Sequence, residues 1–140
     1  MKNPIIYALL FLLLGTIVQA QLSTAFYGNA NNVKFGIGYQ FSDKIWAEAR
    51  VYSDTKIDNI VPEFTANYNF VRANNYDAYV GAGVLVSNST NGFILPVGVA
   101  IKPLENLKNL SLNIEMNPIY EWDLSEFYIR GFFGVRYILK

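Results

Sequence analysis

Apolar and polar side chains alternate along most of the chain from residue 21 onward. Successive side chains of a β-strand point to opposite faces, so a period of two predicts strands with one apolar and one polar face. No helical period competes with this alternation. We predict eight strands, at about Leu22–Gly28, Val33–Phe41, Ile45–Asp54, Ile60–Val71, Tyr76–Val86, Phe93–Lys102, Leu110–Trp122 and Phe127–Leu139.

Clusters of Asn, Asp, Ser and Gly separate the predicted strands, as the geometry of tight turns favours. One connection contains Leu104–Leu110, which could form a single helical turn. The connections are all short, so an antiparallel up-and-down arrangement is expected. They are Asn29–Asn32, Ser42–Lys44, Ser53–Asn59, Arg72–Asn75, Ser87–Gly92, Pro103–Asn109 and Asp123–Glu126.

One face of the second to eighth predicted strands, here called the apolar face, carries no charged residue. The first strand alternates less regularly. Counted from the first residue of each range, the apolar face takes every second residue of Val33–Phe41, Ile45–Val51, Ile60–Phe70, Tyr76–Val86, Phe93–Ile101, Leu110–Tyr120 and Phe127–Leu139.

The opposite face, here called the polar face, holds charges of both signs and most of the glycines. Its charged residues are Lys34, Glu48, Arg50, Glu63, Asp77, Lys102, Glu115, Glu121, Arg130 and Arg136. Its glycines are Gly36, Gly38, Gly81, Gly83, Gly98 and Gly134.

This pattern fits a soluble barrel with the apolar face inside, or a membrane barrel with the apolar face outside. The apolar face includes twelve Phe and Tyr rings, which is far too much bulk for the interior of an eight-stranded barrel. Glycine suits a crowded interior, and charges of both signs can pair inside a closed lumen. We therefore predict a single all-β, antiparallel transmembrane β-barrel over residues 21–140.

Aromatic residues of the predicted outer face flank the turns at both ends, with aliphatic residues and alanine between them. Two girdles of rings separated by aliphatic side chains are typical of a protein that spans a bilayer. The girdle candidates are Phe41, Phe70, Tyr76 and Tyr137 at one end, and Phe93, Tyr120, Trp122 and Phe127 at the other.

The N-terminus has the features of a secretory signal peptide. Lys2 provides the positive charge, Ile5–Leu14 is an unbroken apolar run, and Val18 and Ala20 occupy the positions that a signal peptidase reads. The apolar stretch is shorter than the roughly 20 residues that a spanning helix needs. We predict cleavage after Ala20, so that residues 1–20 are a signal peptide and the mature chain begins at Gln21.

Composition excludes several functions. Without Lys2, ten Lys and Arg face eleven Asp and Glu, a net charge of −1 that does not favour a nucleic-acid partner. The chain has no Cys and no His, so disulfides, thiolate metal sites and a histidine general base are all absent. Charged residues make up only 16% of the chain, which is low for a soluble domain.

Two segments resemble the small eight-stranded outer-membrane β-barrel proteins. The hairpin Phe35–Tyr52 combines a strand with Gly and Tyr, a tight polar turn and an alternating return strand, and Gly131–Leu139 looks like a closing strand that the assembly machinery reads. It departs from that pattern by ending in Lys140 rather than an aromatic residue. The resemblance implies a location in the bacterial outer membrane, with membrane lipids and the outer-membrane assembly machinery as partners.

No catalytic, cofactor or metal site is expected. Three carboxylates of the polar face could suggest a paired-acid hydrolase, but a filled barrel offers no substrate cleft, so ion pairing inside the lumen is the preferred interpretation. The candidates for these pairs are Glu48, Glu63 and Glu115 with Arg50, Arg130 and Arg136. Four acids of the predicted outer loops could bind calcium weakly but more often only solvate a loop: Asp54, Asp58, Asp123 and Glu126.

The sequence thus favours a non-enzymatic outer-membrane barrel with a structural or surface-interaction role and a lumen plugged by ion pairs. Two alternatives stay open. One is a narrow channel for water or small solutes, and the other is a soluble, lipocalin-like carrier of an apolar ligand with the two faces reversed. Adhesion through the outer loops is disfavoured because those loops are short.

Overall fold

A computed structural model describes residues 21–53, 60–88 and 90–139. The predicted signal peptide and the loop acids Asp54 and Asp58 lie outside these residues. Within them, no helix is long and apolar enough to cross a membrane. The strands are β1 (Gln21–Gly28), β2 (Val33–Gln40), β3 (Ile45–Ser53), β4 (Ile60–Arg72), β5 (Tyr76–Val86), β6 (Asn91–Ile94), β7 (Val97–Ile101), β8 (Leu110–Glu121) and β9 (Glu126–Ile138).

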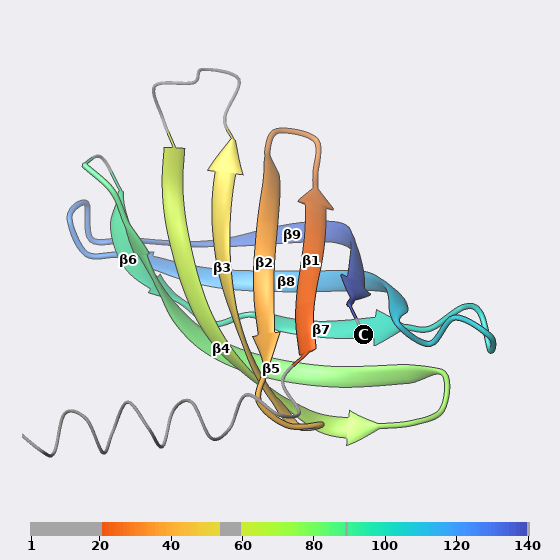
Figure 1. Cartoon of the computed structure of the whole chain (residues 1–140). Helices are drawn as coiled ribbons and strands as arrows, with labels where there is room; N and C mark the ends of the chain where they lie inside the picture. Colours follow the sequence, from red (N-terminus) through yellow and green to blue (C-terminus); the bar gives the residue numbers. More distant parts are fainter. Residues whose placement is uncertain (1–20, 54–59, 89, 140) are drawn as a thin grey trace, which may run out of the picture.

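The strands form one closed antiparallel barrel (Figure 1). From β1 to β5, and from β8 to β9, each strand pairs with the next one in the chain, β6 and β7 each pair with β5 and β8, and β1 closes the barrel against β9 over Ser23–Gly28 and Phe133–Ile138. β6 and β7 together occupy one position between β5 and β8, so the nine segments make the predicted eight-stranded barrel. Both ends of the described chain, at β1 and β9, therefore lie at the same end of the barrel.

The prediction of one continuous strand over Phe93–Lys102 was wrong. The strand is interrupted at Leu95 and Pro96, which separate β6 from β7. The Gly81 amide donates a hydrogen bond to the Pro96 carbonyl at 2.7 Å, but Pro96 has no N–H with which to return it. The backbone hydrogen bond that Pro96 cannot donate to β5 is missing, and this divides the strand into β6 and β7 without changing its direction.

The other predicted strand ends agree with the structure to within one residue, and β5 has the predicted bounds. The single helical turn that Leu104–Leu110 could form is not present. This segment forms two consecutive tight turns, in which the Leu107 amide donates to the Leu104 carbonyl and the Leu110 amide donates to the Leu107 carbonyl, each at 3.1 Å.

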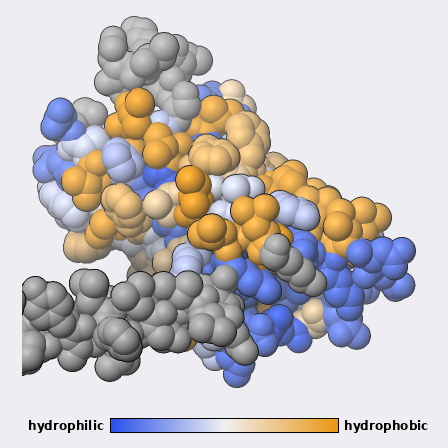
Figure 2. Space-filling model, in the orientation of Figure 1, coloured by the Kyte–Doolittle hydropathy of each residue, from blue (hydrophilic) through white to orange (hydrophobic). Residues whose placement is uncertain are grey.

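The apolar face lies on the outside of the barrel. None of its residues is buried, and none of the charged residues of the polar face is exposed. Figure 2 shows apolar residues over much of the visible surface between hydrophilic groups. The soluble alternative required the apolar face to line the interior, and the structure has the opposite arrangement. In β1, Ser23, Ala25 and Tyr27 point inward.

Glycines of the polar face make room for large side chains inside the barrel. A Cβ atom built on Gly98 would lie 2.5 Å from the Tyr79 ring and hydroxyl and 2.9 Å from the Ile114 carbonyl oxygen. A Cβ on Gly134 would collide with the Tyr27 ring. Each tyrosine thus lies over the backbone of a neighbouring strand, where any side chain would exclude it.

We predict that Gly98→Ala destabilises the barrel by about 1–3 kcal/mol, because the new methyl group overpacks the Tyr79 site. The matched control is Gly131→Ala, since a Cβ there meets no atom within 4 Å. Thermal unfolding, followed by the mobility of unboiled protein on gels, compares the two variants. Equal unfolding temperatures would contradict the steric role of Gly98.

Candidate functional site

Arg50 is the centre of a buried ion network in the barrel lumen. Its Nη1 donates to Glu63 Oε1 at 2.9 Å and to Glu115 Oε1 at 2.7 Å, and its Nη2 donates to Glu115 Oε2 at 2.9 Å. Its Nε donates to Glu48. Glu48 and Arg50 share a face of β3 because they are two residues apart, and the strand register sets Glu63 of β4 opposite Arg50.

A second cation and two tyrosines complete the network. Lys34 Nζ lies 3.2 Å from Glu115 Oε1 and 3.7 Å from Glu63 Oε1. The Tyr79 hydroxyl donates to Glu115 Oε2 at 2.6 Å, and the Tyr27 hydroxyl donates to Glu48 Oε2 at 3.4 Å. The side chains that form the ion pairs are all 0% exposed. The network therefore ties β1, β2, β3, β4, β5 and β8 together.

The ion pairs expected for Arg130 and Arg136 are not formed among the described residues, and both guanidinium groups lie against aromatic rings instead. The Arg136 guanidinium lies 3.7 Å from the centre of the Trp46 ring, and that of Arg130 lies 4.7 Å from the centre of the Tyr128 ring. Among the described residues, no carboxylate forms an ion pair with either arginine. The register explains this, because uncharged residues lie opposite both: Ala25 and Ser111 beside Arg136, and Asn117 beside Arg130.

Arg136 adds a third buried cation near the network. The network itself holds two cations and three carboxylates, and so has a formal net charge of −1. The Tyr79 ring lies 5.9 Å from the Arg136 guanidinium while the Tyr79 hydroxyl binds Glu115. Arg136 is therefore held beside the network by cation–π contacts rather than by an ion pair.

Clusters of buried apolar side chains lie in the lumen on both sides of the ion network. Trp46, Tyr79 and Ala100 pack together toward the end of the barrel that holds the chain termini, with the Trp46 and Tyr79 rings edge to face at 5.3 Å. Buried polar side chains lie toward that end too, among them Asn67, Asn69 and Arg136. The larger cluster at the other side consists of Ala25, Tyr27, Tyr52, Leu85, Ile94, Ile119 and Phe132.

Sequence reasoning missed several lumen residues. Lys34 was on the predicted polar face but was not chosen as an ion-pair candidate, and Tyr27 lies in the strand with the least regular pattern. Buried amides and hydroxyls also contribute, such as the Asn69 side chain, which accepts a hydrogen bond from Trp46 Nε1 at 3.2 Å. Alternation alone could have assigned Lys34 and Asn69 to the lumen, but it could not have assigned Tyr27 or identified the partners of any of the three.

No described group of acidic residues has a metal-binding arrangement. Asp123, one of the loop acids, accepts a hydrogen bond from Asn91 Nδ2 at 2.8 Å, and Glu126 is exposed at the start of β9. In the lumen, each carboxylate that could serve a hydrolase is held by Arg50. The arrangement can pack and neutralise charge, but it leaves no described acid free beside a cleft.

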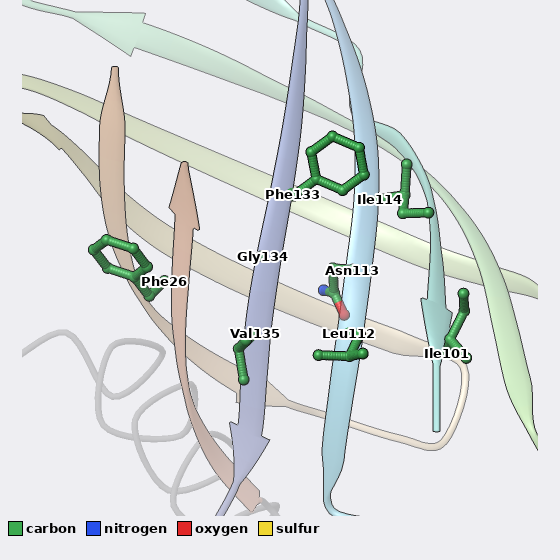
Figure 3. Close-up of a pocket in the computed structure, with 8 residues that line it drawn as sticks. All are labelled: Phe26, Ile101, Leu112, Asn113, Ile114, Phe133, Gly134 and Val135. Carbon is green, nitrogen blue, oxygen red and sulfur yellow. The ribbon is translucent and has the colours of Figure 1, made fainter. Parts of the chain in front are cut away.

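The aromatic girdle candidates all lie on the outside of the barrel and are exposed: Phe41, Phe70, Tyr76, Phe93, Tyr120, Trp122, Phe127 and Tyr137. A shallow groove of about 360 Å³ also opens on the outside of β1, β7, β8 and β9 (Figure 3). Its lining is almost wholly apolar, with Phe26, Ile101, Leu112, Ile114, Phe133 and Val135 beside Asn113 and Gly134.

Charged side chains inside and apolar side chains outside are the arrangement of a transmembrane β-barrel, and comparison with solved structures supports the barrel fold. The N-terminal β-barrel domain of Pseudomonas aeruginosa OprF is similar with a TM-score of 0.66 and 15% identity, over 86% of this chain and 96% of that one. A de novo designed transmembrane β-barrel is similar with a TM-score of 0.60 and 16% identity, over 86% of this chain and 94% of that one. No family model and no curated protein matches the chain.

We predict that Arg50→Met destabilises the barrel by about 3–5 kcal/mol, because it leaves buried carboxylates without their cation. The control is Arg72→Met, which removes a partly exposed arginine 3.3 Å from Asp43 and should cost about 0–1 kcal/mol. Urea unfolding of the folded barrel in lipid vesicles, followed by tryptophan fluorescence, measures both. Similar losses in the two variants would contradict the role of Arg50.

Proposed function

We propose that this chain is a non-enzymatic structural protein of the bacterial outer membrane, exported by a signal peptide that is cleaved after Ala20. The observation that carries the proposal is the distribution of charge on the outer surface. Among the described strand residues, the only exposed charged side chains are Arg72 and Glu126, which are the last residue of β4 and the first of β9. Between the strand ends, the outside of the barrel is suited to lipid.

A closed barrel also meets the main requirement of a bilayer, which is that backbone hydrogen-bonding groups are paired within the protein. β1 and β9 pair with each other, so the described sheet leaves neither of them as a free edge. The exposed rings at both ends of the barrel suit the two membrane interfaces. The chain termini would lie in the periplasm, where the assembly machinery would receive β9 as the closing strand.

The buried side chains of the lumen favour a structural role over transport. The ion network joins six strands, and a cluster of buried apolar side chains lies on each side of it. A permeating ion would have to displace buried, paired charges, so the plugged barrel is favoured over a narrow channel for water or small solutes. The described connections at the end away from the termini are short, which disfavours broad surface contacts.

The membrane orientation predicts that arginine is not tolerated in the middle of the outer face. Val80 and Val97 lie opposite each other on β5 and β7 and are 41% and 44% exposed. Val80→Arg or Val97→Arg should cost about 2–4 kcal/mol and block membrane assembly. Val33→Arg is the control, since Val33 is 39% exposed but begins β2, where the cost should be about 0–1 kcal/mol. Normal fractionation of the two central variants would refute the proposed facing.

A plugged lumen predicts no ion conductance in planar bilayers. The mature protein should produce no single-channel steps, because the network and the buried side chains on both sides of it obstruct the path. Reproducible steps that change in size in Glu115→Gln, which alters the network without touching the outer face, would favour the transport function instead.

A further inference from the structure

The connection between β7 and β8 is the longest described connection at the end of the barrel where the termini lie. It spans residues 102–109, whereas the other two connections at that end span 41–44 and 73–75. Within it, a three-residue unit repeats in the sequence Leu104-Glu105-Asn106-Leu107-Lys108-Asn109-Leu110. Each unit closes one of the two consecutive turns, and we call this segment the tandem turn.

The tandem turn exposes large apolar side chains. Leu104, Leu107 and Leu110 recur at every third position, one at each end of the two turns, and we call them the leucine row. Leu104 is 51% exposed and Leu107 is 39% exposed, although both are large apolar side chains in a short connection.

The leucine row continues the apolar outer surface of the barrel. Leu110 begins β8, and Leu112, two residues later on the same face, pairs with Ile101 at the end of β7. Leu112 and Ile101 both line the outer groove. The tandem turn joins these two strands, so its leucines extend the lipid-facing surface beyond the strand ends.

We propose that the tandem turn is an interfacial anchor, which inserts Leu104 and Leu107 into the periplasmic phospholipid leaflet. The inference rests on the proposed location in the outer membrane. Continuity with the apolar outer surface identifies lipid as the partner, since no described element covers the row. Each leucine moved from water into the acyl chains gains transfer free energy in proportion to its buried apolar area.

Charge plays no net part in this anchor. Glu105 and Lys108 are exposed and carry opposite charges, and Lys102 is already bound to Asp77 at 2.7 Å. The segment therefore offers no excess of basic groups of the kind that draws polybasic segments to anionic lipid. Insertion should be independent of anionic lipid content and of salt concentration.

The test uses single cysteines, which the chain otherwise lacks. Leu104→Cys and Leu107→Cys carry an environment-sensitive fluorophore in the mature barrel, reconstituted in phosphatidylcholine vesicles that contain nitroxide-labelled lipid. Asn106→Cys and Asn109→Cys are the controls at polar positions of the same segment. We expect the nitroxide lipid to quench the leucine-site labels several-fold more than the asparagine-site labels, with no change when phosphatidylglycerol or high salt is added.

A label at Val97→Cys separates failure of the anchor from failure of the membrane location. If lipid quenches the Val97 label but not the labels at 104 and 107, the anchor is wrong while the membrane barrel stands, and the leucine row is left for a periplasmic protein. If quenching at 104 and 107 requires phosphatidylglycerol or disappears at high salt, apolar insertion is wrong. If the Val97 label is also unquenched, the membrane location itself fails.

Discussion

The structure depends on the ion pairs that neutralise Arg50 inside the closed lumen. An ionised side chain away from water is tolerated only when oppositely charged groups and hydrogen bonds surround it. Here the groups that contact Arg50 come from β1, β3, β4 and β8, and Lys34 of β2 and Tyr79 of β5 bind one of its carboxylate partners, so the network exists only when these strands pair in one register. A slip of one residue would turn every side chain of a strand to the other face and bring charge to the outside.

The same alternation that gathers charge inside places bulk outside. Glycine on the lumen side gives Tyr27 and Tyr79 the room that the interior of a small barrel lacks, and their hydroxyls then reach the buried carboxylates. The aromatic and aliphatic residues of the apolar face need no room, because they point away from the barrel. Packing, charge balance and the proposed membrane facing are thus consequences of one period-two pattern.

The sequence predicted the strands and their facing well because both depend on local rules, namely alternation and the limited volume of an eight-stranded interior. The break at Pro96 was missed although its cause is local, since a residue without an N–H cannot complete a pair with Gly81. The contacts between side chains across the lumen could not be predicted from the sequence. Glu115 meets Arg50 because of how the barrel closes, and Arg136 meets Trp46 for the same reason, and no spacing within one strand encodes either contact.

The facing of the barrel wall is tested most directly by spin labels on successive single cysteines along β4, from Phe64 to Asn69, in lipid vesicles. A label that collides with oxygen faces lipid, and a label that collides with a water-soluble nickel complex faces water. We expect oxygen to reach Phe64, Ala66 and Tyr68, and we expect neither reagent to reach Thr65, Asn67 and Asn69. Access of the nickel complex to the first three positions, or the loss of alternation along the strand, would contradict this facing.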